Sequence, residues 1–153
     1  MSIFHSINTS GSGLTAQRLR MDVISSNIAN MDTTRATVNE NGEYEPYQRK
    51  MTVFQQRGEG FSTLLQSARN SQSTRGGSGV RVTEITEDET EPFKLVYNPN
   101  HPDANEEGYV EMPNVDPLKE MVDMMSATRS YEANVTALNA SKTMLMKALE
   151  IGR

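Results

Sequence analysis

Apolar residues recur every seven positions near the N-terminus, a pattern typical of a helix that packs along a narrow stripe. It predicts a helix from about Ile3 to Asn30, roughly 40 Å long at the rise of an α-helix. The glycines around residues 10–13 weaken it, since each helical Gly costs about 1 kcal/mol relative to Ala. We therefore expect the first dozen residues to be ordered only when docked. The seam consists of Ile7, Leu14, Met21 and Ile28, with Ile24 on a companion seam.

The C-terminal region carries a longer pattern of the same kind. Asp116 is a good N-cap, and Pro117 suits the first helical position, where its missing N–H does no harm. Neither Gly nor Pro follows until Gly152, which predicts a helix about 50 Å long. The polar Lys142 interrupts one of two seams, which can fix the register of paired helices. These seams consist of Met121, Thr128, Val135, Lys142 and Leu149, and of Met124, Tyr131, Leu138 and Leu145.

The middle of the chain favours strands and turns. Asn41-Gly42 is a strong signal for a tight hairpin. Residues 57–79 are rich in Gly, Ser, Gln and Asn, which predicts a flexible loop. Alternating or β-branched runs predict strands over residues 47–55, 80–85, 93–97 and 109–112.

Together these elements predict an α+β fold, in which long terminal helices pack as an antiparallel, coiled-coil-like pair beside a small β-rich module. The expected parts are an N-terminal helix (1–34), a middle module (35–115) and a C-terminal helix (116–153). Two such helices bury little apolar area against the entropy of ordering them. We therefore interpret the seams as interfaces between helices in an assembly of identical or similar chains. An ordinary two-helix hairpin, folded onto its own middle segment, fits the periodicity equally well.

Composition narrows the possible functions. The chain has 153 residues, about one domain, and a net charge of −5, which argues against binding nucleic acid. It contains no Cys, so disulfides, thiolate metal sites and a cysteine nucleophile are excluded. No apolar run is long enough to span a bilayer. The first residues resemble no secretory signal, so we expect export, if any, without signal cleavage.

A metal site is the one chemical candidate in the middle module. His101 and Asp103, with Glu106 and Glu107 close behind, offer possible ligands. Residues 98–103 are also dense in turn-forming residues, and we favour a turn. No nucleophile elbow, zinc motif or dinucleotide fingerprint is present. The sequence therefore predicts no catalytic residue, metal, cofactor or small-molecule substrate.

Short motifs carry a family resemblance. Ser26-Asn27-Ile28-Ala29-Asn30, followed by Thr33-Thr34, resembles the N-terminal signature of bacterial flagellar axial proteins of the rod and hook. Residues 46–55, 97–104 and 108–134 further resemble the FlgC family of proximal rod proteins. The motif residues that we single out are Asn27, Ala29, Asn30, Thr33, Asn98, Pro99, His101, Pro102, Asp103, Asn114 and Pro117.

The resemblance implies a non-enzymatic subunit of the rod, the torque-transmitting drive shaft of the flagellar basal body. Its implied partners are copies of itself, the rod proteins FlgB, FlgF and FlgG, and the adaptor FliE. It also implies passage through the flagellar type III export apparatus to a site outside the cytoplasmic membrane. The alternatives are another rod protein such as FlgB, a non-flagellar coiled-coil adaptor, and a metal-dependent hydrolase resting only on the His101 turn.

Overall fold

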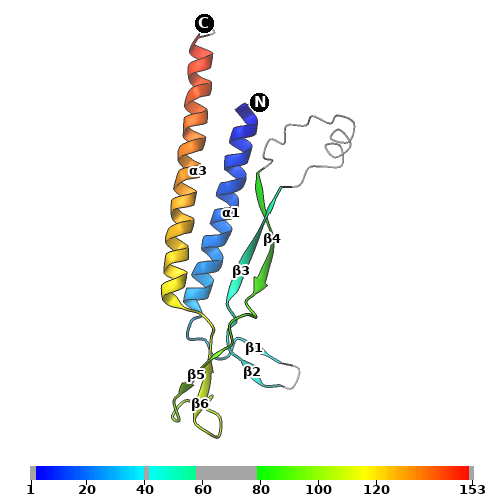
Figure 1. The fold of residues 1–153 in the computed structure, drawn as a ribbon, viewed down its shortest axis with the longest axis vertical. Coiled ribbons are helices and arrows are strands. Elements are labelled where there is room, and N and C mark those ends of the chain that lie inside the picture. The colour runs from blue at the N-terminus through cyan, green and yellow to red at the C-terminus, as the bar shows by residue number, and fades with distance from the viewer. Residues whose placement is uncertain (1–2, 40–41, 58–78, 152–153) are drawn as a thin grey trace, which may run out of the picture. The chain divides into compact units, whose positions relative to one another are not determined.

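The computed structural model describes residues 3–39, 42–57 and 79–151, and it confirms the α+β prediction of two long terminal helices and a small β-rich middle (Figure 1). Most of the expected 57–79 loop, and residue 41 of the expected tight turn, lie outside the described residues. In chain order the elements are α1 (Ile3–Ala29), β1 (Thr37–Val38), β2 (Tyr44–Glu45), β3 (Lys50–Gln56), β4 (Val80–Glu87), β5 (Lys94–Tyr97), β6 (Tyr109–Met112) and α3 (Pro117–Ile151).

Side chains cap one end of each helix, and the cap at Asp116 is the one that the sequence predicts. Asp116 Oδ1 accepts a hydrogen bond from the Leu118 N–H at 3.0 Å, and Pro117 begins α3. This N-cap satisfies a backbone donor that the helix itself leaves unpaired. At the other end of the chain, the Asn30 side chain donates to the Ser26 carbonyl at 2.9 Å and satisfies an acceptor in the last turn of α1. The C-terminal end of α1 and the N-terminal end of α3 are therefore each capped by a local polar residue.

The strands form three two-stranded ribbons among the described residues: β1 with β2, β3 with β4, and β5 with β6. The first and third are antiparallel, with Val38 opposite Tyr44 and Tyr97 opposite Tyr109. Gly42 has a φ of +85°, as the predicted tight turn requires. The ribbons confirm the strands expected from the alternating pattern. They do not join into one sheet, so side-chain and loop contacts must hold each of them.

Two compact units share the chain. The first contains residues 1–19, 53–84 and 127–153, and the second contains residues 20–52 and 85–126. Each unit therefore holds part of both helices and part of the β3–β4 ribbon. Within the described residues, neither helix is apolar enough to cross a membrane.

The first unit shows how closely α1 and α3 approach. The hydroxyls of Ser6 and Ser141 lie 3.2 Å apart, and a Cβ added to Gly13 would lie 3.0 Å from Asn134 Oδ1. These two contacts are one heptad apart on each helix and run in opposite directions, so this part of the pair is antiparallel. Ala127 of α3 is fully buried. Small residues on the facing sides allow this short interaxial approach.

Candidate assembly surface and its buried support

The inner side of α3 combines one predicted seam with a polar companion. Four residues of that seam are half-buried: Met124, Tyr131, Leu138 and Leu145. The companion positions hold Glu120, Ala127, Asn134 and Ser141, which are buried or half-buried. The other predicted seam lies toward the edge of the helix, with Thr128 and Val135 half-buried and Met121, Lys142 and Leu149 exposed. The apolar heptad pattern thus identified one of the two rows of residues on the inner side of α3. It missed the companion row, whose side chains are small or polar.

The same displacement holds on α1. Ile24 is buried, whereas the other predicted seam residues are only half-buried: Ile7, Leu14, Met21 and Ile28. The buried positions of α1 are Ser10, Gly13, Ala16, Val23, Ile24 and Asn27. Several of these residues are too small or too polar to be counted in a hydrophobic pattern. The predicted seam of α1 therefore lies mostly beside the most buried positions of the helix and not on them.

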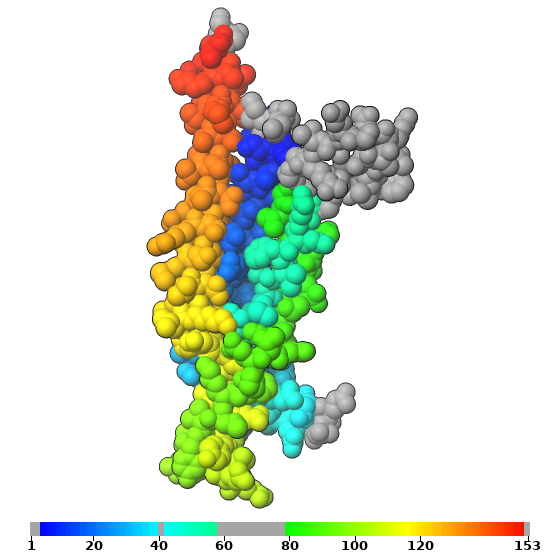
Figure 2. All heavy atoms as spheres, in the orientation of Figure 1, coloured from blue at the N-terminus to red at the C-terminus, as the bar shows by residue number. Residues whose placement is uncertain are grey.

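An exposed apolar stripe begins α3. Its side chains are between 51% and 67% exposed, and their spacing of three and four residues places them on one helix face. We call it the α3 outer patch, which consists of Leu118, Met121, Val122 and Met125. Figure 2 shows part of the outward surface of α3, coloured yellow to red. Contiguous apolar surface of this kind marks interaction sites in soluble proteins.

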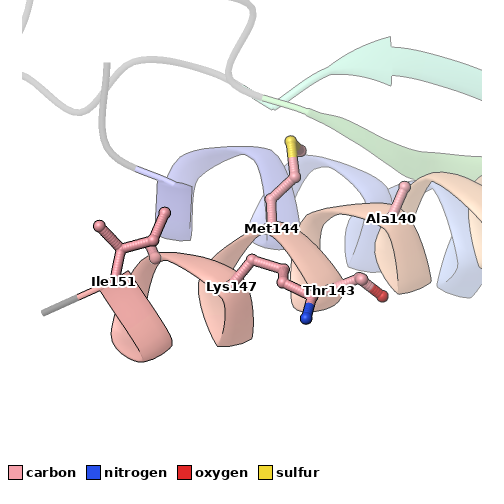
Figure 3. A pocket seen from close by; sticks show the side chains of 6 residues that line it. Ala140, Thr143, Met144, Lys147 and Ile151 are labelled. Atoms are coloured by element: carbon pink, nitrogen blue, oxygen red, sulfur yellow. The ribbon is translucent and has the colours of Figure 1, made fainter. Parts of the chain in front are cut away.

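The last turns of α3 also carry exposed apolar side chains. Met144, Met146, Leu149 and Ile151 are between 55% and 87% exposed. A shallow, mostly apolar groove runs along this part of the helix, and the side chains that line it all arise from α3 (Figure 3). The groove holds no cluster of polar groups that would bind a small ligand. Its lining residues are Ala140, Thr143, Met144, Lys147, Ala148 and Ile151.

A buried ionic cluster supports the start of α3 within the second unit. The guanidinium of Arg49 donates from Nε to Glu120 Oε1 at 2.6 Å and from Nη1 to Asp88 Oδ2 at 3.1 Å. Its Nη2 lies 3.5 Å from Asp123 Oδ2, and Asp123 also accepts from Arg20 at 2.9 Å. The Glu120 side chain is 0% exposed. Buried charges of this kind persist in proteins only when they are paired and hydrogen-bonded.

The protonation equilibria of the cluster follow from these contacts. Desolvation lowers the pKa of the Arg49 guanidinium, but the bonds to Glu120 and Asp88 outweigh it, so the pKa rises above its ordinary value. The hydroxyl of Thr90 is the main cause that holds the pKa of the Asp88 carboxyl below 3.8, and Arg49 adds to it against the opposing effect of burial. Arg49 and Asp88 are therefore both charged at neutral pH.

Two asparagines hydrogen-bond to the backbone where β3 begins. Asn27 of α1 accepts from the Lys50 N–H at 3.0 Å and donates to the Lys50 carbonyl at 2.9 Å. Asn27 also donates to Glu120 Oε2 at 3.0 Å. Asn114, just before α3, accepts from the Arg49 N–H at 2.7 Å. Its amide also donates to the carbonyls of residues 88 and 91. Asn27 from α1 and Asn114 from the segment before α3 thus hold the adjacent backbone amides of Lys50 and Arg49.

The other N-terminal motif residues lie around the end of α1. The hydroxyl of Thr33 donates to Asn30 Oδ1 at 3.3 Å, and the Thr33 carbonyl accepts from the Tyr47 N–H at 3.0 Å. The phenol of Tyr47 in turn donates to Asn27 Oδ1 at 3.0 Å. Ala29 is exposed. These contacts connect the end of α1 to the segment that enters β3.

The motif residues between β5 and β6 form a turn. Asn98 donates its N–H to the Gly108 carbonyl at 2.9 Å, and Pro99 and Pro102 are exposed. Asp103 accepts from the Thr34 hydroxyl at 2.8 Å and from Arg35 Nε at 2.6 Å. The bond from Arg35 is the main cause that lowers the pKa of the Asp103 carboxyl.

His101 completes this turn, since its Nδ1 accepts from the Asp103 N–H at 3.2 Å. The His101 and Asp103 side chains therefore have partners within the turn and the neighbouring segment. Among the described residues, no group of three or more His, Asp or Glu side chains could hold a metal ion. The geometry matches the turn that the sequence favours.

Sequence reasoning missed the partners in the ionic cluster. Arg49 and Glu120 lie within the ranges that carry the family resemblance, and Asp88 lies in none of the predicted strands. Arg49 and Glu120 are 71 positions apart in the chain. One feature of the sequence could have suggested a buried ion pair. Glu120 is an acidic residue on the inner side of a helix that otherwise follows an apolar heptad pattern.

Comparisons with known proteins agree with this architecture. A family model described as "Flagella basal body rod protein" matches residues 7–37, and one described as "Flagellar basal body rod FlgEFG protein C-terminal" matches residues 106–151. The matched segments contain most of α1 and all of α3.

Full-length relatives carry one name. The flagellar basal-body rod protein FlgC of Bacillus subtilis is 65% identical over 153 residues, which cover all of both chains. FlgC of Borreliella burgdorferi is 46% identical, over 99% of this chain and 98% of that one. FlgC of Escherichia coli is 39% identical over all of both chains. These identities favour FlgC over FlgB and over a non-flagellar adaptor. The chain belongs to the FlgC family of flagellar basal-body rod proteins.

Proposed function

We propose that this structural subunit of the flagellar basal-body rod assembles through the outer faces of its two helices, with α3 contributing most of the contact. The observation that carries the proposal is the α3 outer patch, whose four apolar side chains are all more than half exposed. Full burial of one such side chain is worth about 1.5–3 kcal/mol. Leaving four of them in water is costly for a monomer, and packing against neighbouring helices would recover that free energy.

We assign each residue of the predicted seams either to the proposed contact surface or to the interior of the chain, according to its exposure. Met121 and Leu149 would contact neighbouring chains, together with the half-buried Thr128 and Val135 at the edge of α3. The inner residues of α3 would remain within the chain: Met124, Tyr131, Leu138 and Leu145. On α1, the partly exposed Ile7, Leu14, Met21 and Ile28 would complete the contacts with neighbours.

The finer parts of the function are also proposals. The chain would transmit torque without catalysing a reaction. Its neighbours would be its own copies, FlgB, FlgF, FlgG and the adaptor FliE. It would pass through the flagellar type III export apparatus without signal cleavage and act outside the cytoplasmic membrane. The motif resemblance supports these assignments, and many long helices packed side by side would resist twisting because shear must break many close contacts at once.

Val122→Asp tests the assembly surface. Val122 is 54% exposed, so the chain should fold with unchanged helix content, whereas a carboxylate buried between helices costs several kcal/mol. The matched control is Val38→Asp, since Val38 is 58% exposed and lies on β1 rather than on a helix. In cells that lack the native protein, Val122→Asp should abolish swimming and rod formation, and Val38→Asp should restore both. Normal swimming with Val122→Asp would contradict the proposed surface.

A further inference from the structure

The carboxylate of Glu120 receives its partners from two other parts of the second unit. Arg49, immediately before β3, donates to Oε1 at 2.6 Å, and Asn27 of α1 donates to Oε2 at 3.0 Å. The side chain is fully buried, so water cannot replace either donor. A buried carboxylate that loses its cationic partner is strongly destabilising, whereas replacing both charges by apolar groups is often neutral. Burial of Glu120 at the start of α3 therefore has a low free-energy cost only when Arg49 donates to its carboxylate.

We infer that Glu120 is a conditional latch, through which the first turns of α3 become ordered only after the segment around Arg49 has docked on α1. The latch acts on the α3 outer patch, because Leu118, Met121 and Val122 flank Glu120 on the same turns. This role rests on the proposed function of that patch. A chain whose middle segment is not yet folded would not present an ordered assembly face.

The neighbouring contacts determine which substitutions can separate a latch from ordinary packing. Without Glu120, Arg49 keeps Asp88 at 3.1 Å and Asp123 at 3.5 Å, and the Asn27 amide keeps the Lys50 carbonyl at 2.9 Å. Glu120→Leu therefore leaves each former donor residue with a partner. Without Arg49, the neutral Asn27 amide is the side-chain donor that Glu120 keeps among the described residues. Arg49→Met thus leaves two buried carboxylates, Glu120 and Asp88, without their guanidinium partner. Adding Glu120→Leu removes the first of them, while Asp88 keeps the Thr90 N–H at 3.1 Å.

Amide hydrogen exchange of residues 118–126 tests the latch in dilute, unassembled full-length chain. Arg49→Met should accelerate exchange there at least about tenfold, a modest fraction of the effect of breaking a buried pair. Glu120→Leu should exchange within about threefold of the native chain, and the double variant should exchange at least about threefold more slowly than Arg49→Met, so that the second substitution partly rescues the first. The matched control is Arg20→Met, because Arg20 pairs with Asp123 at 2.9 Å but both side chains are about one-third exposed. It should change exchange by less than about threefold.

Failure of rescue would overturn the inference: equal exchange in Arg49→Met and the double variant would show that Arg49 does not act through Glu120. An effect of Arg49→Met no larger than that of Arg20→Met would also overturn it. If Arg49→Met unfolds entirely, recovery of helix by circular dichroism in the double variant supports the latch, and continued unfolding refutes it. Exchange in the unassembled chain is independent of rod formation. Failure of this test therefore differs from failure of the assembly surface, which swimming of Val122→Asp measures.

Discussion

Two glycines of α1 offer a sharp test of how closely the helices approach. A Cβ added at Gly11 would meet nothing within 4 Å, whereas one added at Gly13 would lie 3.0 to 3.2 Å from three side-chain atoms of Asn134. Both substitutions to Ala gain about 1 kcal/mol of helix propensity. Gly11→Ala should therefore stabilise the chain by that amount, raising Tm by about 2–4 °C for a domain of this size.

Gly13→Ala should behave differently because Asn134 cannot easily withdraw. The Asn134 amide donates to the Ser130 carbonyl at 2.9 Å, which fixes the side chain against α1. Overpacking of a tight contact costs about 1–3 kcal/mol, so the net effect should range from neutral to about 2 kcal/mol destabilising. The helices must separate by a few tenths of an ångström or Asn134 must leave its partner.

A double-mutant cycle separates propensity from the clash. In an Asn134→Ala background the obstructing atoms are gone, so Gly13→Ala should stabilise by about 1 kcal/mol, as Gly11→Ala does in the native chain. Thermal and urea unfolding followed by circular dichroism would measure all five chains. If Gly13→Ala alone stabilises as much as Gly11→Ala, the two helices do not approach as closely at Gly13 as the geometry requires.

Two further predictions concern acid and the β5–β6 turn. The pKa of the Asp88 carboxyl is lowered from 3.8, so its stabilising effect is present above the ordinary value and is lost as pH falls through the folded pKa. Asp88→Asn should therefore lower stability at pH 7 and flatten the loss of stability below about pH 4 in acid titrations followed by circular dichroism, and an unchanged acid profile would contradict this. Gly108 has a φ of +82°, and a Cβ added there would lie 3.0 Å from the Tyr97 ring. Gly108→Ala should therefore lower the free energy of unfolding by about 1–3 kcal/mol, as measured by urea unfolding, and an unchanged midpoint would contradict this.

Local signals predicted the secondary structure well because each acts within a few residues. The cap at Asp116, the proline that follows it and the positive φ of Gly42 are all consequences of short-range sterics and hydrogen bonding. The Arg49–Glu120 pair could not be found in this way. Its two residues are 71 positions apart, and the inward position of Glu120 on its helix does not indicate which cation it pairs with. Only the folded chain brings them together.

The inner side of the helix pair explains why the predicted seams lie partly outside it. Where α1 and α3 meet in the first unit, the contacts come from Ser6 with Ser141 and from Gly13 with Asn134. Small side chains bring the helix axes close, and close axes leave little room for large apolar residues between them. The larger apolar side chains therefore remain at the edges and on the outer face.

This arrangement also bears on the two interpretations that periodicity left open. A self-sufficient hairpin should turn its largest apolar side chains inward, since burial of apolar area is its main source of stability. Here the α3 outer patch and the last turns of α3 keep methionine, leucine, valine and isoleucine side chains more than half exposed. Methionine is also suited to surfaces that must fit neighbours of differing sequence, because its side chain adapts its shape. The distribution of apolar area therefore favours a subunit whose helices are completed by other chains.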